Sequence, residues 1–437
     1  MSIAVPSRLF LWMLADPTKP RLIGEIRPLQ NGDVSLTYAD AWNKAGFALS
    51  ADMPLGQNEY TPMHRRARQK AAPGALDDAR PDAWGEKVIR HLHQPKGLRV
   101  FDALYLAGDE RFGALGVSGS GDLYAPFPTG PLPQLKDAQS ISDVVKLIES
   151  GGLLAQQQRL LATAHASLGG AKPKAIISID GEQWVLKLFS AEPIDHPLAE
   201  HATMTLAAKA GIHVAETRLV PLAGENAVAV KRFDREGAKR LHCVSAATVL
   251  RAETPPGEEP AYGYPHLARI LRRFADPNTV DGQLLDLFRR MVFNMLMANT
   301  DDHEKNHALM VRNPAAPTTL ELTPAYDMVP TGSGATAHEF LISEDSPEPA
   351  LANAMAVCAQ FDLSPQRAAL EVAAIIGIVN SWQAHFRACG VSERDIAEWV
   401  SVIDRADLLH ERASFDAAHY TDTPKATRSR RERKPFA

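Results

Sequence analysis

The sequence is poor in cysteine and has no long apolar run. Its three cysteines, Cys243, Cys358 and Cys389, are far apart in a chain of 437 residues, so neither a disulfide framework nor a CxxC metal site can form. The apolar stretch Arg8–Leu14 is too short for a secretion signal or a membrane span, and no other run approaches membrane length. We therefore expect a cytoplasmic protein without membrane contact.

Length and charge limit the remaining classes. A chain of 437 residues with 45% apolar and 23% charged residues is ordinary for a globular protein and long enough for two or three packed units. The net charge of −5 is uneven: the tail Lys425–Lys434 has six basic residues and one Glu, which leaves about −10 for the rest. The body of the protein therefore does not have the basic charge of a protein that coats nucleic acid.

The first part of the chain predicts a small mixed α/β unit. Short apolar and alternating segments separated by turn signals predict strands, and two segments with helical spacing predict helices. The expected strands are Leu9–Leu14, Leu22–Ile26, Asp33–Tyr38 and Phe112–Val117, and the expected helices are Trp84–Leu92 and Val100–Leu106. The proline-rich stretch Tyr124–Pro133 breaks regular structure, so we place a domain boundary there.

The rest of the chain combines one sheet with many helices. After a helix over Ser142–Leu161, a hairpin is expected over Ala175–Phe189 with Asp180-Gly181 at its turn, then a helix over Pro197–Ala210 and a strand over Ala227–Val230. From Val244 onward helical patterns dominate. They cover Tyr264–Phe274, Asp281–Met297, Glu348–Phe361, Pro365–Arg387 and Ser392–Arg412.

The polar octet Asn299–Asn306 follows the strongest of these helices and precedes the strand-like His307–Val311. Within it, Asp301 and Asn306 have the Asp-x4-Asn spacing of a kinase catalytic loop, in which the Asp accepts the substrate hydroxyl proton and the Asn binds Mg²⁺. A solvated loop rich in turn residues is the alternative. A metal site made by Asp301, Asp302, His303 and His307 is a weaker alternative, because these residues lack the helical spacing of HExxH-type sites.

A glycine pair precedes the hairpin. In Ser167–Lys174, Gly169 and Gly170 allow a sharp turn and close approach to a ligand, and Lys172 and Lys174 add positive charge, although the stretch is neither a Walker A motif nor Gly-x-Gly-x-x-Gly. On the second hairpin strand, Lys187 shares a face with Val185 and Phe189. A strand lysine after a glycine-rich loop can reach nucleotide phosphates.

Three further features fit the same chemistry. Glu200, expected in the first turn of its helix, can pair with Lys187 or simply favour the positive end of the helix dipole. The strand ending at Val230 runs into Lys231, Arg232 and Phe233, as an interlobe hinge would. Asp327, between two prolines and 21 positions after Asn306, is where a second Mg²⁺ ligand is required in a kinase, although alone it would be an ordinary turn residue.

With these motifs in place, the sequence resembles the HipA family, the serine/threonine kinase toxins of bacterial HipBA-type toxin–antitoxin modules. The resemblance extends to about Arg412 and rests on Ser167–Lys174, Val230–Arg235, Asn299–Asn306 and Thr323–Asp327. It implies Asp301 as catalytic base, Asn306 and Asp327 as Mg²⁺ ligands, and Ser167 as the autophosphorylated serine. It implies an ATP site formed by Gly169, Gly170, Ala171, Lys172, Lys174, Lys187, Lys231, Arg232, Phe233, His303, Asn306 and Asp327. Lys231 departs from the family pattern, since other members can have an acid there.

The resemblance also implies an α+β, two-lobed, protein-kinase-like fold with an extra N-terminal α/β subdomain. We expect that subdomain over residues 1–125, an N-lobe over 140–235, a helical C-lobe over 236–415 and a disordered basic tail over 416–437. The implied partners are a HipB-like DNA-binding antitoxin, with DNA contacted only through it, and a translation-linked substrate such as an aminoacyl-tRNA synthetase. A small-molecule or lipid phosphotransferase and a catalytically weak co-repressor remain alternatives.

Overall fold

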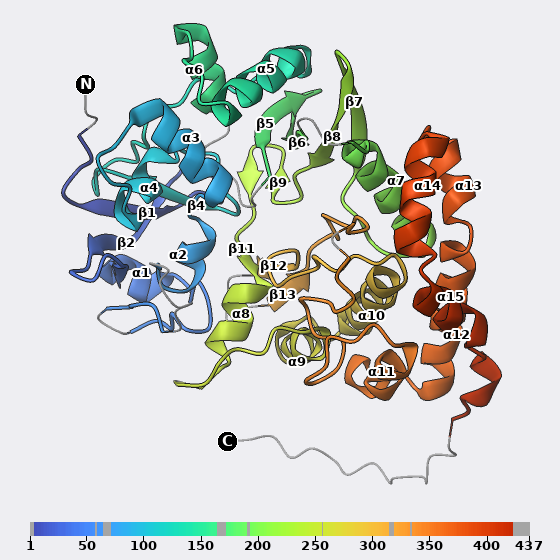
Figure 1. Cartoon of the computed structure of the whole chain (residues 1–437). Helices are drawn as coiled ribbons and strands as arrows, with labels where there is room; N and C mark the ends of the chain where they lie inside the picture. Colours follow the sequence, from blue (N-terminus) through green and yellow to red (C-terminus); the bar gives the residue numbers. More distant parts are fainter. Residues whose placement is uncertain are drawn as a thin grey trace, which may run out of the picture.

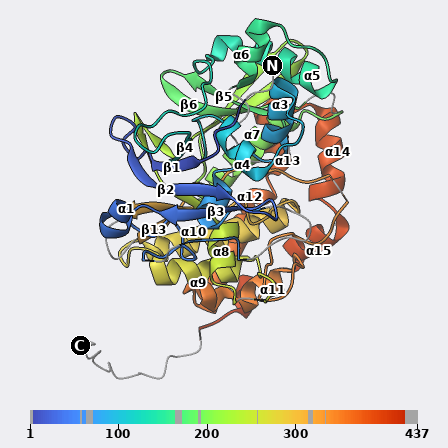
Figure 2. The ribbon, with the colours of Figure 1, turned by 90° about the vertical axis from the view of Figure 1, so that its left-hand side faces the viewer.

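The structure, a computed structural model, describes residues 4–56, 59–63, 71–163, 172–189, 193–255, 257–313, 319–332 and 334–422. Three regions follow one another along the chain (Figure 1): an N-terminal domain with strands β1–β4, an N-lobe around strands β5–β8, and a mostly helical C-lobe. In the side view of Figure 2, β1–β3 lie at the level where the N-lobe above meets the C-lobe below. Every helix within the described ranges is too short or too polar to cross a lipid bilayer.

The N-terminal domain is built on an antiparallel sheet with the strand order β3-β2-β1-β4. Its strands are β1 (Leu9–Met13), β2 (Arg21–Pro28), β3 (Val34–Tyr38) and β4 (Leu115–Ser118). The first three predicted strands are confirmed, whereas the fourth begins three residues later than predicted. Gly113 has a left-handed φ of 74° and its N–H donates to the Asp234 carboxylate, so this part of the expected strand is used for a contact with another region.

One helix of this domain is shared with the N-lobe. Within its described residues, the domain contains the helices α1 (Asp40–Ala45), α2 (Gly74–Asp78), α3 (Ala83–His93) and α4 (Val100–Leu106). The Asp82 side chain caps α3 by accepting from the Gly85 N–H. Trp84, Val88, Ile89 and Leu92 of α3 are buried in the same hydrophobic core as the N-lobe sheet. The N-terminal domain is therefore joined to the N-lobe through a common core.

The N-lobe sheet has the order β5-β6-β8-β7 with antiparallel neighbours. Its strands are β5 (Lys174–Ile179), β6 (Glu182–Lys187), β7 (Thr217–Leu222) and β8 (Glu225–Lys231). Asp180 and Gly181 join β5 to β6 with positive φ values of 54° and 82°. Positive φ at both central residues gives the turn the twist that a two-residue hairpin needs, so the predicted hairpin is confirmed.

The two faces of this sheet are covered differently. On one face, Trp184 and Leu186 pack with α3 and with α5 (Ala138–Glu149), which follows the short η1 (Leu135–Asp137). The other face carries Val185 and Lys187 and is covered by α7 (His196–Lys209). The prediction of one helix over Ser142–Leu161 is wrong: α5 ends at Glu149, Gly151 has a φ of 73°, and a separate α6 (Gln156–Thr163) follows.

The C-lobe begins with small strands and continues as helices. The strands are β9 (Arg235–Glu236), β10 (Lys239–Arg240), β11 (Cys243–Ser245), β12 (Ala308–Asn313) and β13 (Thr319–Leu322). The first helices are α8 (Ala246–Ala252), α9 (Tyr264–Phe274) and α10 (Val280–Leu296). The predicted helices over Tyr264–Phe274 and Asp281–Met297 are confirmed, the second shifted by one residue. The side chains of Phe288, Met291 and Val292 on α10 are fully buried, as the apolar stripe predicts.

The later helices are shorter than predicted. They are α11 (Leu351–Ala356), η2 (Cys358–Phe361), α12 (Pro365–Val379), α13 (Trp382–Ala388), α14 (Glu393–Ile403), α15 (Ala406–Ser414) and η3 (Ala417–His419). The predicted continuous helices Pro365–Arg387 and Ser392–Arg412 are wrong. The first breaks where the Ser381 hydroxyl donates back to the Ile378 carbonyl, and the second breaks at Asp404, whose carboxylate accepts from Trp382, Gln383 and Arg412.

Candidate active site

Lys187 forms one ion pair within the N-lobe and a second one that joins the two lobes. Its Nζ lies 2.6 Å from Glu200 Oε1 on α7 and 2.6 Å from Asp327 Oδ1 in the C-lobe. The alternation of side chains along β6 turns Lys187 toward α7. Glu200 is the fifth residue of α7, beyond its first turn, and its side chain points toward β6. The expectation of Glu200 in the first turn is therefore wrong, while its expected proximity to Lys187 is found.

The electrostatics of this trio are asymmetric. Burial alone would lower the pKa of the Lys187 ammonium, but the charges of Asp327 and Glu200 outweigh burial and raise it. Burial raises the pKa of Glu200, which is only 1% exposed, and Lys187 offsets only part of that effect. Burial would also raise the pKa of Asp327, but Lys187 and Lys174 lower it to about 2. The ion pair with Lys187 therefore stabilises the ionised form of Asp327. For Glu200, the ion pair only partly offsets the free-energy cost of burying the ionised carboxylate.

The segment that carries Asp327 is held from both lobes. Asp327 adopts a left-handed φ of 59°, which Asp tolerates better than most side chains. Just before it, the Ala325 N–H donates to the His213 carbonyl at 2.7 Å, and the Thr323 carbonyl accepts from the buried Arg290 guanidinium at 2.6 Å. These contacts fix the backbone in a conformation that directs Asp327 toward Lys187.

The polar octet forms a compact loop after α10, next to the Asp327 segment. Asp301 is exposed, and its backbone N–H donates to Thr331 Oγ1 at 3.3 Å. The Asn306 amide nitrogen donates to the Asp301 carbonyl at 3.2 Å, and its backbone N–H donates to the His303 carbonyl at 2.9 Å. The loop therefore holds Asp301 and Asn306 together. His303 of this loop also lowers the pKa of Asp327, after the larger effects of the two lysines.

A buried polar group anchors this loop and was missed in the sequence. Asp302 is 1% exposed, accepts a hydrogen bond from the Tyr264 hydroxyl, and has its Oδ1 3.0 Å from His307 Nε2. The Tyr264 hydroxyl also accepts from the Asn294 amide at 2.9 Å. His307 and these hydrogen bonds outweigh burial and lower the pKa of Asp302. Local patterns could not reveal the pair because Tyr264 and Asp302 are 38 residues apart.

The metal-site alternative for this loop is wrong. Asp302 and His307 point into the buried group, whereas Asp301 is exposed. Among the residues that the structure describes, no group of three or more His, Cys, Asp or Glu side chains is placed to hold a metal ion. The donors at the Lys187 site are instead a carboxylate and an amide.

The predicted hinge residues point in three directions. Lys231 Nζ pairs with Glu182 at 2.7 Å near the surface. The Arg232 side chain is 2% exposed and points toward the N-terminal domain, where Glu110 lies. Phe233 stacks on Tyr326, with ring centroids 5.4 Å apart, and the Tyr326 hydroxyl donates to the Lys305 carbonyl at 2.8 Å. Of the three, Phe233 is thus the side chain in contact with the Asp327 segment.

The glycine loop is only partly within the described residues. Ser167, Gly169, Gly170 and Ala171 lie outside them. Lys172 Nζ lies 4.5 Å from the ring centroid of Phe189, in the range of a cation–π contact. Lys174 begins β5 opposite Lys187 in the strand register and is 8% exposed, and burial lowers its pKa despite nearby acids. Lys174 therefore lies beside Lys187 in the sheet, and Lys172 lies against Phe189, two residues further along the chain from Lys187.

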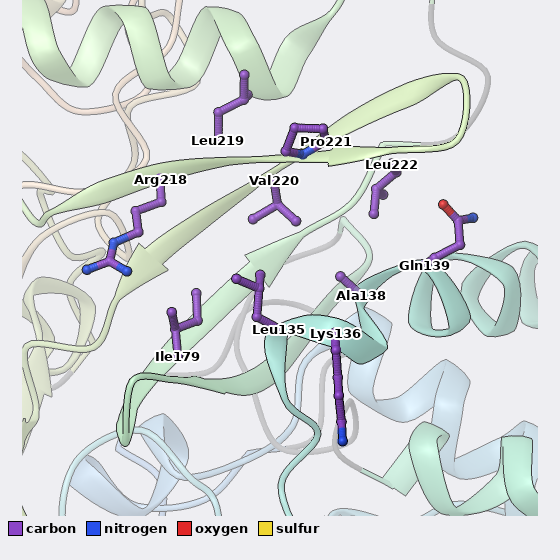
Figure 3. A pocket seen from close by; sticks show the side chains of 10 residues that line it. All are labelled: Leu135, Lys136, Ala138, Gln139, Ile179, Arg218, Leu219, Val220, Pro221 and Leu222. Carbon is purple, nitrogen blue, oxygen red and sulfur yellow. The ribbon is translucent and has the colours of Figure 1, made fainter.

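Two surface hollows lie away from these residues. One, of 350 Å³, lies between β7 and the η1–α5 segment, with Val220, Leu222 and Ile179 facing it (Figure 3). The other, of 390 Å³, is lined by α3 and α6 residues such as Lys87 and Arg159. Neither is lined by Lys187, Glu200 or Asp327. We place the candidate site at the ion-pair cluster because that is where charged groups of both lobes converge.

Comparison with known proteins gives the family. The model of the HipA-like C-terminal domain matches residues 166–403, and that of the HipA N-terminal domain matches residues 18–118. The Sinorhizobium fredii protein named "Putative kinase Y4dM" is 32% identical over 335 residues, which cover 71% of this chain and 76% of that protein. The "Serine/threonine-protein kinase toxin HipA" of Shewanella oneidensis is 24% identical over 338 residues, 70% of this chain and 72% of that protein.

A solved structure gives the fold. HipA in the Shewanella oneidensis MR-1 complex of HipA, HipB and operator DNA superposes with a TM-score of 0.65, at 18% identity, over 93% of this chain and 97% of that one. The predicted fold class is confirmed: an α+β, two-lobed, kinase-like fold with an N-terminal α/β region and a mostly helical C-lobe. The HipA-like C-terminal model matches more than half of this chain, and the HipA N-terminal model matches the region before it. The chain therefore belongs to the HipA family.

Proposed function

We propose that this chain is an ATP-dependent kinase that phosphorylates serine or threonine hydroxyls and acts as the toxin of a toxin–antitoxin module. One observation carries the proposal: Lys187 is paired with Glu200 of the N-lobe and with Asp327 of the C-lobe. The loop next to the Asp327 segment contains Asp301 and Asn306, which are joined by a hydrogen bond. A strand lysine paired with a helix glutamate, followed by a base, an amide and a second acid, is the set of groups that phosphoryl transfer requires.

The roles follow from charge and position. Lys187 remains an ammonium, because its pKa is raised, and it would neutralise phosphate oxygens of ATP. Glu200 would hold that ammonium in place. The exposed Asp301 carboxylate would accept the proton of the attacking hydroxyl, which lets a substrate side chain reach it from solvent. Catalysis would then come from positioning and charge stabilisation, without a covalent intermediate.

The donor set fits Mg²⁺. Asp327 provides a carboxylate, 41% exposed, and the Asn306 amide directs its nitrogen to the Asp301 carbonyl, which leaves the amide oxygen as an acceptor. Oxygen donors of this kind suit Mg²⁺, which keeps several waters and binds through one or two carboxylates together with substrate phosphates. Bound there, the ion would supply charge stabilisation to the transferring phosphoryl group. Asp327 and Asn306 would hold it.

The partners follow from the family. The similar Shewanella oneidensis HipA was solved with HipB and operator DNA, and we propose that this chain also has a HipB-like, DNA-binding antitoxin and contacts DNA only through it. The proposed substrate is a translation-linked protein such as an aminoacyl-tRNA synthetase. Ser167 is the proposed site of autophosphorylation, and Lys172, Lys174 and the hinge around Phe233 would complete the ATP site.

The test is a labelling experiment with a matched inactive variant. The purified chain is incubated with radiolabelled ATP, Mg²⁺ and a lysate of its host, and labelled proteins and residues are identified by mass spectrometry. The Asp301→Asn variant keeps the size of an exposed side chain, so it should fold normally and lose about 10²-fold or more of the labelling. Equal labelling by wild type and variant would contradict the catalytic assignment. Absence of label on Ser167 would contradict autophosphorylation there alone.

A further inference from the structure

A short segment of the N-terminal domain, residues 109–113, lies directly on the hinge segment, residues 232–235. The Arg111 carbonyl accepts from Arg232 Nη2 at 2.6 Å and from Arg235 Nη2 at 3.0 Å. In the opposite direction, the Gly113 N–H donates to Asp234 Oδ2 at 2.7 Å. Backbone and side chains of both segments are thus hydrogen-bonded to each other at the point where β8 ends and the C-lobe begins.

Glu110 adds a charged contact between three elements. Its Oε2 lies 3.4 Å from Arg232 Nη1 and 3.3 Å from Arg235 Nη2, and its Oε1 accepts from the Gln183 amide on β6 at 3.1 Å. The two arginine side chains are only 2% and 6% exposed. Buried guanidinium groups require partners of opposite charge, so the position of both arginines depends on Glu110 as well as on Asp234.

An aromatic series continues from the same segment into the candidate active site. Phe112 packs edge-on against Phe233, with ring centroids 6.2 Å apart and an interplanar angle of 81°. Phe233 stacks on Tyr326, whose hydroxyl donates to the Lys305 carbonyl of the catalytic loop. Tyr326 directly precedes Asp327. A shift of Phe112 or Glu110 would therefore be transmitted through packed rings and hydrogen bonds to the residues around Lys187.

We propose that the 109–113 segment is a positioning element of the nucleotide site, with Glu110 and Phe112 as positioning residues that fix the hinge and the Phe233 ring. The inference rests on the proposed kinase function in one respect, that the hinge borders bound ATP. Arg232 then acts by joining the hinge to the N-terminal domain. A purely structural contact between domains would stabilise the fold without affecting the affinity for ATP, which separates the two interpretations.

The experiment compares Glu110→Gln with Glu25→Gln. Glu25 is a fitting control because it is in the same domain and also pairs with two arginines, Arg8 and Arg27, but on β2, away from the hinge. Two quantities are measured in the full chain: hydrogen exchange of hinge peptides covering residues 228–236 without nucleotide, and the KM and kcat for ATP. We expect Glu110→Gln to speed hinge exchange and raise the KM by about tenfold, the effect of one weakened hydrogen-bonded contact, with kcat within about twofold. The control should leave both unchanged.

Phe112→Leu provides a second variant that keeps every charge. Phe112 is half-buried, so this change should be tolerated, and it should raise the KM in the same direction by loosening Phe233. Hinge exchange equal to wild type in both variants would overturn the inference, whether or not the protein uses ATP. A lower kcat or melting temperature with an unchanged KM would also overturn it, since that is the result of a structural contact. A wild-type protein that fails to bind ATP would instead contradict the proposed function.

Discussion

The two carboxylates that share Lys187 should respond in opposite ways when their charge is removed. Folding lowers the pKa of Asp327, so its ionised form contributes stability that is present above the ordinary pKa near 4 and is lost as the pH falls toward about 2. Folding raises the pKa of Glu200, so burying its ionised form costs stability at pH values above that raised pKa. At pH 7, Asp327→Asn should therefore destabilise the protein, and Glu200→Gln should leave the stability unchanged or increase it.

The magnitude for Asp327 follows from its pKa and exposure. A fall from 3.8 to about 2 corresponds to about 2 kcal/mol of stability above both pKa values. Because the side chain is 41% exposed, solvent screening reduces the expected loss in Asp327→Asn to about 1 kcal/mol. Glu200→Gln keeps an oxygen that can accept from Lys187, and Asp327 remains as a charged partner of the lysine. The usual cost of breaking a buried ion pair should therefore be avoided.

The assay is denaturant unfolding of wild type and both variants, with parallel measurement of phosphotransfer. The difference between wild type and Asp327→Asn should be constant from pH 8 to about 5 and should narrow below about pH 4. Both variants should lose activity, because Asp327→Asn loses a proposed Mg²⁺ ligand and Glu200→Gln replaces the charged partner that orients Lys187 with a neutral one. If Glu200→Gln destabilises the protein more than Asp327→Asn, the asymmetric account of this trio is refuted.

Two more substitutions test the catalytic loop. Asn306→Ala removes both the proposed metal ligand and the hydrogen bond to the Asp301 carbonyl. The Mg²⁺ concentration for half-maximal activity should therefore rise about tenfold or more. An unchanged Mg²⁺ titration would contradict the assignment of Asn306 as a metal ligand. Tyr264→Phe removes the hydroxyl shared by Asp302 and Asn294 and should cost about 1–3 kcal/mol of stability in denaturant unfolding. A variant as stable as wild type would show that Asp302 has other sufficient partners.

Local patterns were enough to predict much of the fold. The β5–β6 hairpin followed from Asp180-Gly181 between alternating strands, and α10 followed from a long apolar stripe. The predicted pairing of Lys187 with Glu200 is found because the strand alternation turns Lys187 toward α7, whereas the direct contact between Lys187 and Asp327 was not predicted. Helix ends were predicted less well where glycines or side chains from other helices decide them, as at Gly151 and Asp404.

Long-range pairing was not predictable in the same way. Asp302 was considered as a metal ligand, but its side chain is engaged with Tyr264 and His307 in the interior of the C-lobe. Arg232 was assigned to the ATP site from its place after β8, yet its side chain extends to Glu110, more than a hundred residues earlier. A sequence shows that a charged residue is present, but its burial and its distant partner depend on how the domains pack.

The core shared by α3 and the N-lobe sheet predicts that the kinase lobes do not fold without the N-terminal domain. Removing residues 1–125 takes Trp84, Val88, Ile89 and Leu92 out of that core. At about 1.5–3 kcal/mol for each large apolar side chain, the loss is about 6–12 kcal/mol, comparable to the whole stability of a typical domain. The fragment 126–437 should therefore show no cooperative thermal transition, and co-expression with residues 1–125 should restore it. A fragment that unfolds cooperatively alone, with β5 and β6 protected from hydrogen exchange, would show that α3 only covers a core that is already sufficient.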